Sequence, residues 1–450
     1  MVYHSGNKNN LKSLESVQNE ALRVCTGAFK STCLSSLHKE CNEMPLKLRH
    51  RQLALQYIVK LRANKDNPAY RQVIPQEIQQ YDTDNTSEDN SSEEENKQSD
   101  TNYRISRTTR QSLPKPFAIR MQEDINRSGI DLWHIAPNTP LPIGPWELSE
   151  THIDLELSKY EKENTNPALY RNLFRCKEQT YKDYAHIYTN GSKSEIKVGA
   201  AAVWEYGPLP KRLPDGCSVY SAEAVALSNA LKIVQTSWHS RFVIFSDSLS
   251  CLQSIENEDI SIPMIKDFLL HYTELTNIGK EIILCWVPSH VGIPGNEKAD
   301  ACAKDALNIT DISPLLTIPY TDMIAKVKDF YKHEWQNWFD IRPCFLGAHS
   351  PQIEKKIYDP QLTRKEQVVV CRTRLGYTRL TESYKMSGQD RPKCDVCDEP
   401  LTIHHILTDC IKYQNTRMKH LPGNTIEEIL KTNDINIIRF LKETNLYKEI

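Results

Sequence analysis

Between Asp183 and Asn308, short β-rich runs alternate with helical stretches in an order that few folds accommodate. Three β-rich runs come first: HIYTN (186–190), VGAAAVWEY (198–206) and a third around CSVY (217–220). A helical stretch (221–235), the buried run RFVIFSDS, two more helical stretches, the run IILCWVPSH and a last helix over GNEKADACAKDAL follow. Three strands in succession, then alternation of helix and strand, predict an α/β (α+β mixed) domain with a mixed sheet and flanking helices.

Acidic side chains occupy positions in this pattern where rigid elements would hold them together. Glu223 lies in the first turn of the helix expected after Ser221, Asp247 ends the strand FVIFS, and Asp300 lies one turn into the helix that follows Pro294 and Gly295. Asn190 takes the corresponding place at the end of the first strand. Carboxylates gathered in this way are the hard oxygen ligands that magnesium prefers.

The segments YTNGSK, SAEA, FSDS and WVPSHVGIPGNEKAD, in this order and spacing, resemble the ribonuclease H family. The likeness is strongest to the domain of jockey-like non-LTR retrotransposons and covers roughly residues 184–308. It implies a five-stranded mixed sheet and hydrolysis of the RNA strand of RNA–DNA hybrids, with two Mg²⁺ ions held by carboxylates. Residue by residue, Glu223, Asp247 and Asp300 match the family's ligands. His290 matches a histidine on a mobile loop, which Gly292 and Gly295 would let move.

Asn190 departs from the family, which has aspartate at this position. A neutral amide supplies at most one carbonyl oxygen and removes a negative charge from between two cations. Because the members of such a unit act together, one loss can reduce the rate by orders of magnitude. We therefore expect either an impaired ribonuclease H or an inactive remnant that binds nucleic acid or protein. A related exonuclease of the same fold is disfavoured by the WVPSH tract.

Each acidic residue also has an ordinary explanation. Glu223 could be a helix N-terminal carboxylate, Asp247 a turn residue and Asp300 a solvated helix charge. Considered one at a time, each acidic residue is better explained in this ordinary way. Considered together, the order and sequence context of the three residues favour a metal site.

A second cluster combines Cys394, Cys397, His405 and Cys410. A CxxC pair followed by a histidine and a cysteine can complete a tetrahedral site, so we expect one structural Zn²⁺. The spacing resembles the CCHC cluster downstream of ribonuclease H in the same retrotransposons. His404 competes for the third ligand position, and His405 is favoured because its interval to Cys410 matches the family. Unligated cysteines in a loop are the alternative.

Four regions are expected along the chain. Residues 1–75 carry two or three amphipathic helices and resemble the segment that follows reverse transcriptase, so the chain is expected to be the C-terminal part of a polyprotein. A simple helical bundle fits them equally well. Residues 76–182 are expected to be a largely disordered acidic and proline-rich linker, because YDTDNTSEDNSSEEENKQSD (81–100) has almost no apolar residues. Residues 183–310 form the ribonuclease H-like domain, and residues 311–450 a helical region, with helices over 323–339 and 364–374, that carries the zinc cluster.

Composition restricts the setting of the protein. The 450 residues contain thirteen cysteines, an odd number that does not suit a secreted disulfide framework, and the chain has no signal-peptide pattern. We expect an intracellular protein of the nucleus or cytoplasm, with no membrane partner. The net charge of -2 shows that the chain is not basic overall, so nucleic-acid binding would depend on local basic surfaces. The oligomeric state is left open.

Overall fold

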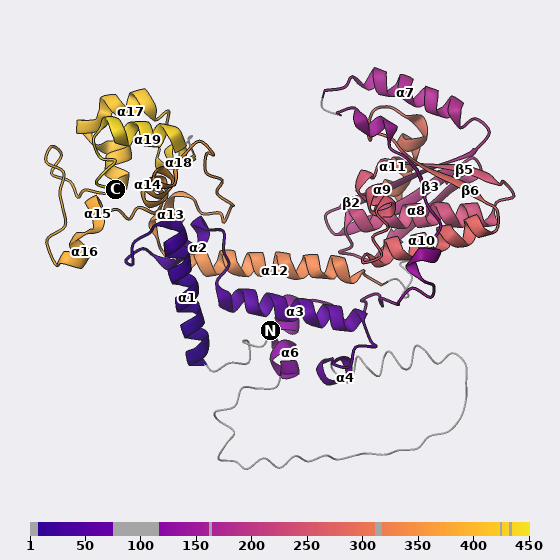
Figure 1. The fold of residues 1–450 in the computed structure, drawn as a ribbon, viewed down its shortest axis with the longest axis horizontal. Coiled ribbons are helices and arrows are strands. Elements are labelled where there is room, and N and C mark those ends of the chain that lie inside the picture. Colours follow the sequence, from indigo (N-terminus) through magenta and orange to yellow (C-terminus); the bar gives the residue numbers. More distant parts are fainter. Residues whose placement is uncertain (1–7, 75–116, 162–163, 311–316, 424, 432–433) are drawn as a thin grey trace, which may run out of the picture. The chain divides into compact units, whose positions relative to one another are not determined.

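The computed structural model describes residues 8–74, 117–161, 164–310, 317–423, 425–431 and 434–450. These residues form two compact units. The terminal unit comprises residues 8–54 and 328–450, and the central unit comprises residues 55–74 and 117–327. Helices α3 (Leu46–Ala63) and α12 (Tyr320–Asp340) each contribute to both units (Figure 1). None of the helices in the described ranges has the apolar length that a membrane span requires.

The central unit is built on a six-stranded mixed sheet with the strand order β1-β6-β5-β2-β3-β4. Its strands are β1 (His152–Asp154), β2 (Ala185–Ser194), β3 (Lys197–Trp204), β4 (Gly207–Leu213), β5 (Arg241–Ser246) and β6 (Glu281–Trp286). Strands β1, β6, β5 and β2 are parallel neighbours, whereas β3 and β4 are added antiparallel. The predicted mixed sheet with flanking helices is confirmed, with a sixth strand beyond the five expected.

The prediction of the third strand around residues 217–220 was wrong. Residues 217–220 do not form a strand: they lead into helix α8 (Val219–Thr236), and the strand that pairs with β3 is β4. Pro208 and Pro210 lie inside β4. Proline has no backbone N–H to donate to a neighbouring strand, so a sequence with two prolines is not expected to form a strand. An edge strand tolerates proline, because one of its sides has no neighbour. β4 is an edge strand, because it is the last in the strand order of the sheet.

Part of the predicted linker is folded. Residues 117–182 contain α6 (Phe117–Ser128), the edge strand β1 and α7 (Pro167–Thr180). Tyr170 and Phe174, four residues apart on α7, are buried in the core of the central unit. The linker expected over residues 76–182 is therefore wrong for α6, β1 and α7; β1 was missed because a three-residue strand has too little periodicity to be recognised. The acidic stretch 81–100 lies outside the described residues.

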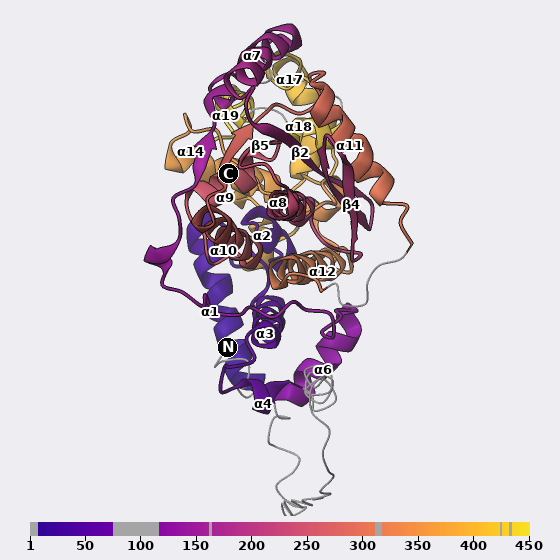
Figure 2. The ribbon, with the colours of Figure 1, turned by 90° about the vertical axis from the view of Figure 1, so that its right-hand side faces the viewer.

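Helices cover both faces of the sheet. Helix α8 lies on one face, where Gly191 of β2 approaches Ala222, and α9 (Leu249–Glu256) and α10 (Pro263–Asn277) pack beside it. Helix α11 (Pro294–Ala306) lies on the other face, where its Gly295 meets the ring of Tyr188, and α7 packs there through Phe174 (Figures 1 and 2). These two layers leave one end of β2 and β5 free to carry polar residues.

The terminal unit joins helices from both ends of the chain. Its α-helices besides α3 and α12 are α1 (Lys8–Thr26), α2 (Leu34–Glu40), α13 (Phe345–His349), α14 (Arg364–Leu375), α15 (Arg379–Glu382), α16 (Tyr384–Ser387), α17 (Gln414–His420), α18 (Ile426–Lys431) and α19 (Asp434–Glu443). The short helix α4 (Tyr70–Val73) belongs to the central unit. Arg372 of α14 donates to the carbonyl of Gly27 at 2.8 Å, and Arg374 donates to Glu40 at 2.8 Å. The N-terminal helices therefore pack on the C-terminal region.

Candidate active site and metal centre

Asn190, within β2, and Asp247, directly after β5, meet where the pairing of these two strands ends. Thr189 pairs with Ser246 in this parallel ladder, so the next residue along each strand lies at the same level. Asn190 is buried, and its Nδ2 donates to Oδ2 of Asp247 at 3.2 Å. Strand β2 continues to Ser194, four residues beyond the end expected from the sequence.

Glu223 reaches the same edge from helix α8. The helix begins at Val219, capped by the side chain of Ser218, so Glu223 lies in the second turn and not in the first. The backbone of Gly191 lies near the carboxylate of Glu223 and lowers its pKa, against the larger effect of burial. A Cβ at Gly191 would lie 2.7 Å from the backbone nitrogen of Glu223, so this close approach requires glycine. Oε2 of Glu223 is buried and has no hydrogen-bond partner.

Asp300 and His290 come from α11 and the loop before it. Lys304 donates to Oδ2 of Asp300 at 2.6 Å, one helical turn away. His290 has a φ of 57°, a strained conformation for a residue with a side chain, and Gly292 follows with a φ of +83°. The ligand atoms of His290, Glu297 and Asp300 all lie within 4.8 Å of one another.

The electrostatics of this edge oppose ionisation of the buried carboxyl groups. Burial raises the pKa of Glu223 well above its usual value, and the charges of Asp247 and Asp300 add to the effect. Burial also raises the pKa of Asp247, whereas a hydrogen bond from Asn296 and the nearby His290 lower it. Among the described residues, however, the oxygens of Glu223, Asp247 and Asp300 do not all lie within 4.8 Å of one another. The three carboxylates are thus electrostatically coupled without forming a closed ligand set.

Two contacts at this edge were not predicted. Nδ2 of Asn296, a residue 2% exposed, donates to Oδ2 of Asp247 at 3.2 Å, the same oxygen that Asn190 contacts. Nε1 of Trp286 donates to the backbone carbonyl of Asp247 at 3.2 Å. Asn296 precedes Asp300 by four residues and therefore shares its face of α11, a spacing that could have identified it.

The residues fit a divalent cation in part. Two buried oxygens, Oε2 of Glu223 and Oδ1 of Asn296, have no hydrogen-bond partner, and coupled carboxylates with raised pKa values favour a cation between them. Asn190 does not add to this charge. Its amide nitrogen faces Asp247 and supplies a donor where the resemblance expects a carboxylate.

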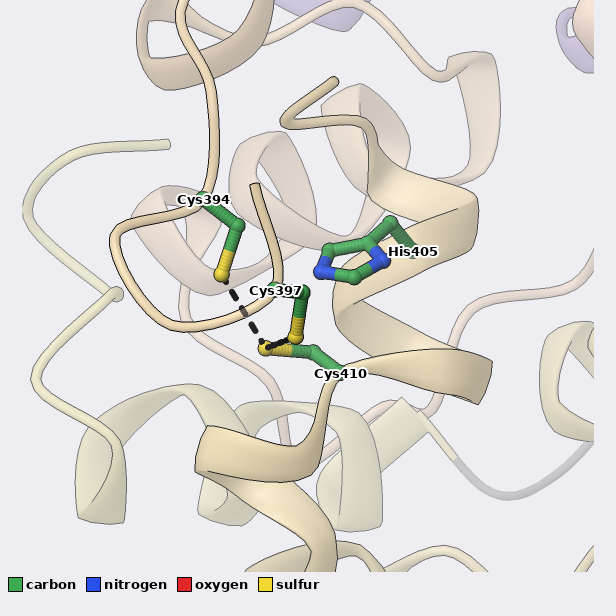
Figure 3. Close-up of side chains that lie close together, drawn as sticks. All are labelled: Cys394, Cys397, His405 and Cys410. Atoms are coloured by element: carbon green, nitrogen blue, oxygen red, sulfur yellow. Dashed lines mark hydrogen bonds between the residues drawn. The ribbon is translucent and has the colours of Figure 1, made fainter. Parts of the chain in front are cut away.

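Cys394, Cys397, His405 and Cys410 lie together in the terminal unit (Figure 3). Their ligand atoms all lie within 4.8 Å of one another, and Sγ of Cys410 is 3.6 Å from Sγ of Cys394 and 3.9 Å from Sγ of Cys397. A tetrahedron with Zn–S bonds of about 2.3 Å places its sulfur atoms about 3.8 Å apart. The geometry therefore fits a zinc ion.

His405, and not His404, is the histidine that joins the three thiols. Nε2 of His405 is buried without a hydrogen-bond partner, as a metal ligand would be in the absence of its ion. His404 instead has Nδ1 hydrogen-bonded to Asp409 at 3.2 Å and to Thr408 at 3.1 Å. A short π-helical turn over His405–Asp409 turns His405 toward the cluster.

The thiols of this cluster differ in their electrostatic environment. A hydrogen bond from the backbone N–H of Val396 lowers the pKa of Cys394 to about 6, against the effect of its burial. Burial raises the pKa of Cys410 to about 11. The loop that carries Cys394 and Cys397 is closed by a backbone hydrogen bond from Cys394 N to Glu399 O at 2.8 Å.

Comparison with known proteins gives a family match for one part of the chain. Residues 182–308 match the family model of RNase H. The chain is similar to the crystal structure of RNase H1 from the halophilic archaeon Halobacterium salinarum NRC-1, with 22% sequence identity over 28% of this chain and 97% of that chain and a TM-score of 0.23. No match was found among curated proteins. At the family level, an RNase H domain indicates hydrolysis of RNA–DNA hybrids, usually with Mg²⁺.

Proposed function

Since residues 182–308 match RNase H, we propose that this domain cleaves the RNA strand of RNA–DNA hybrids endonucleolytically, at a rate reduced by Asn190. The observation that carries the proposal is that the charges of Asp247 and Asp300 act on buried Glu223, and that of Asp300 on Asp247, at one sheet edge. The proposed ligands are Glu223, Asp247, Asp300 and the side-chain oxygen of Asn190, holding two Mg²⁺ ions. The chemistry supplied by bound magnesium is activation of a water molecule and stabilisation of the leaving oxygen.

The protein's own groups orient the substrate and move protons. His290 stands exposed beside Asp300, on a loop with two positive φ angles, where it can take or give a proton at the departing product. The hydrogen bonds from Asn296 and Trp286 hold Asp247 in place on its side-chain and backbone oxygens. Recognition of the hybrid rests on its 2′-hydroxyls and its backbone.

A catalytically inactive, nucleic-acid-binding or protein-binding remnant is the second candidate. One observation favours it: Asn190 and Asn296 both donate to Oδ2 of Asp247, so this oxygen has hydrogen-bond partners without a metal ion. Oδ2 of Asp247 therefore needs no cation as its partner in the folded protein.

Cleavage of a labelled RNA–DNA hybrid with Mg²⁺ separates the two candidates. The natural protein is compared with Asn190→Asp, with Asp247→Asn in the Asn190→Asp background as the inactive control, and with single-stranded RNA and duplex DNA as substrate controls. We expect Asn190→Asp to be faster by about 10²-fold or more, because members of a catalytic unit act together. Equal rates for the natural protein and Asn190→Asp contradict the proposed impairment. Hybrid binding without cleavage by either protein supports the inactive remnant.

The wider setting is also proposed. The order of helical segment, RNase H domain and Cys394, Cys397, His405 and Cys410 cluster supports the C-terminal part of a non-LTR retrotransposon polyprotein that holds one structural Zn²⁺. Three of the four proposed zinc ligands are cysteine thiols, which remain available in a reducing compartment. We accordingly place the protein in the nucleus or cytoplasm.

A further inference from the structure

A pocket in the terminal unit is lined by more basic than acidic side chains. Its volume of about 200 Å³ is room for roughly six water molecules at about 30 Å³ each. Five cationic side chains line it: Lys39, Lys355, Lys356, Arg374 and Lys431. Three carboxylates also line it, from Glu40, Glu354 and Glu427, so the lining has an excess of two positive charges.

Two of the three carboxylates already have partners. Oε1 of Glu40 accepts from Nε of Arg374 at 2.8 Å and from the hydroxyl of Tyr358 at 2.6 Å. Oε1 of Glu427 is hydrogen-bonded to Nδ1 of His349 at 2.9 Å. These hydrogen bonds direct one oxygen of each carboxylate to Arg374, Tyr358 or His349 and not to a lysine.

The remaining lysines have little negative charge near them. Lys356 pairs with Asp434 at 2.7 Å. In the described part of the chain, Lys39, Lys355 and Lys431 form no ion pair, and Glu354 is the one pocket carboxylate without a partner of its own. Lys39, Lys355 and Lys431 thus outnumber the two lining carboxylates, Glu354 and Glu427, that have no lysine or arginine partner.

Lys39 makes this imbalance costly. Its side chain is 3% exposed, its Nζ donates to the hydroxyl of Ser350 at 3.1 Å, and Nζ lies 4.9 Å from the centre of the Phe339 ring. Burial and the charge of Arg374 lower the pKa of Lys39 to about 8, whereas the charges of Glu40 and Glu354 raise it. A buried cation without a counter-ion is unfavourable, and a bound anion removes that cost.

We propose that this pocket binds a phosphate group as the counter-ion of Lys39, Lys355 and Lys431. A phosphate presents close to two negative charges and three strong acceptor oxygens, which suits several lysine donors around a small polar cavity. The group can come from inorganic phosphate or from the terminal phosphate of a nucleic-acid strand. The proposal concerns the terminal unit and does not depend on hybrid cleavage by the RNase H domain.

The pocket takes its lining from both ends of the chain. Lys39 and Glu40 belong to α2, whereas Arg374 belongs to α14 and Lys431 to α18. The phosphate site therefore exists only while the N-terminal helices pack on the C-terminal region. Binding of phosphate stabilises that packing by mass action.

Titration calorimetry of the full chain with inorganic phosphate, at constant ionic strength against chloride, tests the proposal. We expect saturable binding that weakens by about tenfold or more in Lys39→Met, because a hydrogen bond to a charged group is lost from a buried site. Lys365→Met, at an exposed position on α14 outside the pocket, is the matched control and should bind as the natural protein does. If Lys39→Met does not fold, Lys355→Gln at the exposed rim decides the question, with an expected weakening of several-fold.

A second set of titrations identifies the source of the phosphate. A short single-stranded DNA with a 5′-phosphate is compared with the same strand carrying a 5′-hydroxyl. Tighter binding of the phosphorylated strand than of both the 5′-hydroxyl strand and inorganic phosphate assigns the pocket to a strand end, and equal binding of the two strands assigns it to free phosphate. Absence of phosphate binding, or binding that neither Lys39→Met nor Lys355→Gln weakens, overturns the proposal.

Discussion

The protein has two clusters of candidate metal-ligand side chains, and they differ in how many hydrogen bonds their own residues make to the ligand atoms. In the terminal unit, three thiols and His405 converge, and Nε2 of His405 is left buried without a partner. In the central unit, the amide of Asn190 and that of Asn296 fill the acceptor positions of one Asp247 oxygen. Oε2 of Glu223 is also buried without a partner, so internal pairing covers only part of the central cluster, whereas the ligand nitrogen of the terminal cluster has no partner at all.

Metal removal should separate the two clusters most clearly. We expect a zinc chelator, or Cys394→Ser, to destabilise the terminal unit by an apparent free energy on the order of 10 kcal/mol and to leave the central unit folded. Zinc content by mass spectrometry and thermal unfolding followed by circular dichroism measure both effects. Cys176→Ser, at an exposed position outside the cluster, is the control. Full zinc occupancy in Cys394→Ser contradicts the ligand set.

A single substitution should make the central cluster behave more like the terminal one. Without divalent cations, Asn190→Asp loses the hydrogen bond to Asp247 and places a second carboxylate beside it, which we expect to lower the free energy of unfolding by about 1–3 kcal/mol. With Mg²⁺ the change should reverse, because cation binding stabilises the folded state. Denaturant unfolding with and without Mg²⁺ measures this difference. A variant whose stability is indifferent to Mg²⁺ argues against a cation at this edge.

Helix caps give the smallest expected effects and show which unit unfolds in each transition. Thr363 caps α14 with a hydrogen bond from Glu366 N, and Ser218 caps α8 with one from Ser221 N. We expect Thr363→Ala to lower the stability of the terminal unit by about 1 kcal/mol, and Ser218→Ala to do the same for the central unit. Thr363→Ser and Ser218→Thr keep the capping oxygen and are the controls. Equal shifts of both transitions by either alanine variant mean that the two units unfold together.

Local sequence patterns were sufficient for most of the central unit. The runs around β2, β3, β5 and β6 and the helix over 295–307 were recognisable because alternating and helical periodicity are properties of neighbouring residues. The carboxylates of the candidate site followed from the same elements, since parallel strands end at a common edge. The CxxC spacing predicted the thiol cluster for a similar reason, because Cys394 and Cys397 share one tight turn.

Long-range contacts decided the rest of the molecule. The edge position of β4 made Pro208 and Pro210 acceptable in a strand, and burial against the sheet ordered α7 within the expected linker. Asn296 became part of the Asp247 environment only when α11 packed across the sheet.

The terminal unit shows the same limit most strongly. Lys39 and Arg374 lie 335 positions apart in the chain, yet they line one pocket. No periodic pattern in the sequence predicts that they lie close together. Spacing in the sequence reports what a single helix, strand or turn can place together. Sites assembled from distant elements depend on packing, because packing brings charges together whose mutual energy is absent from the extended chain.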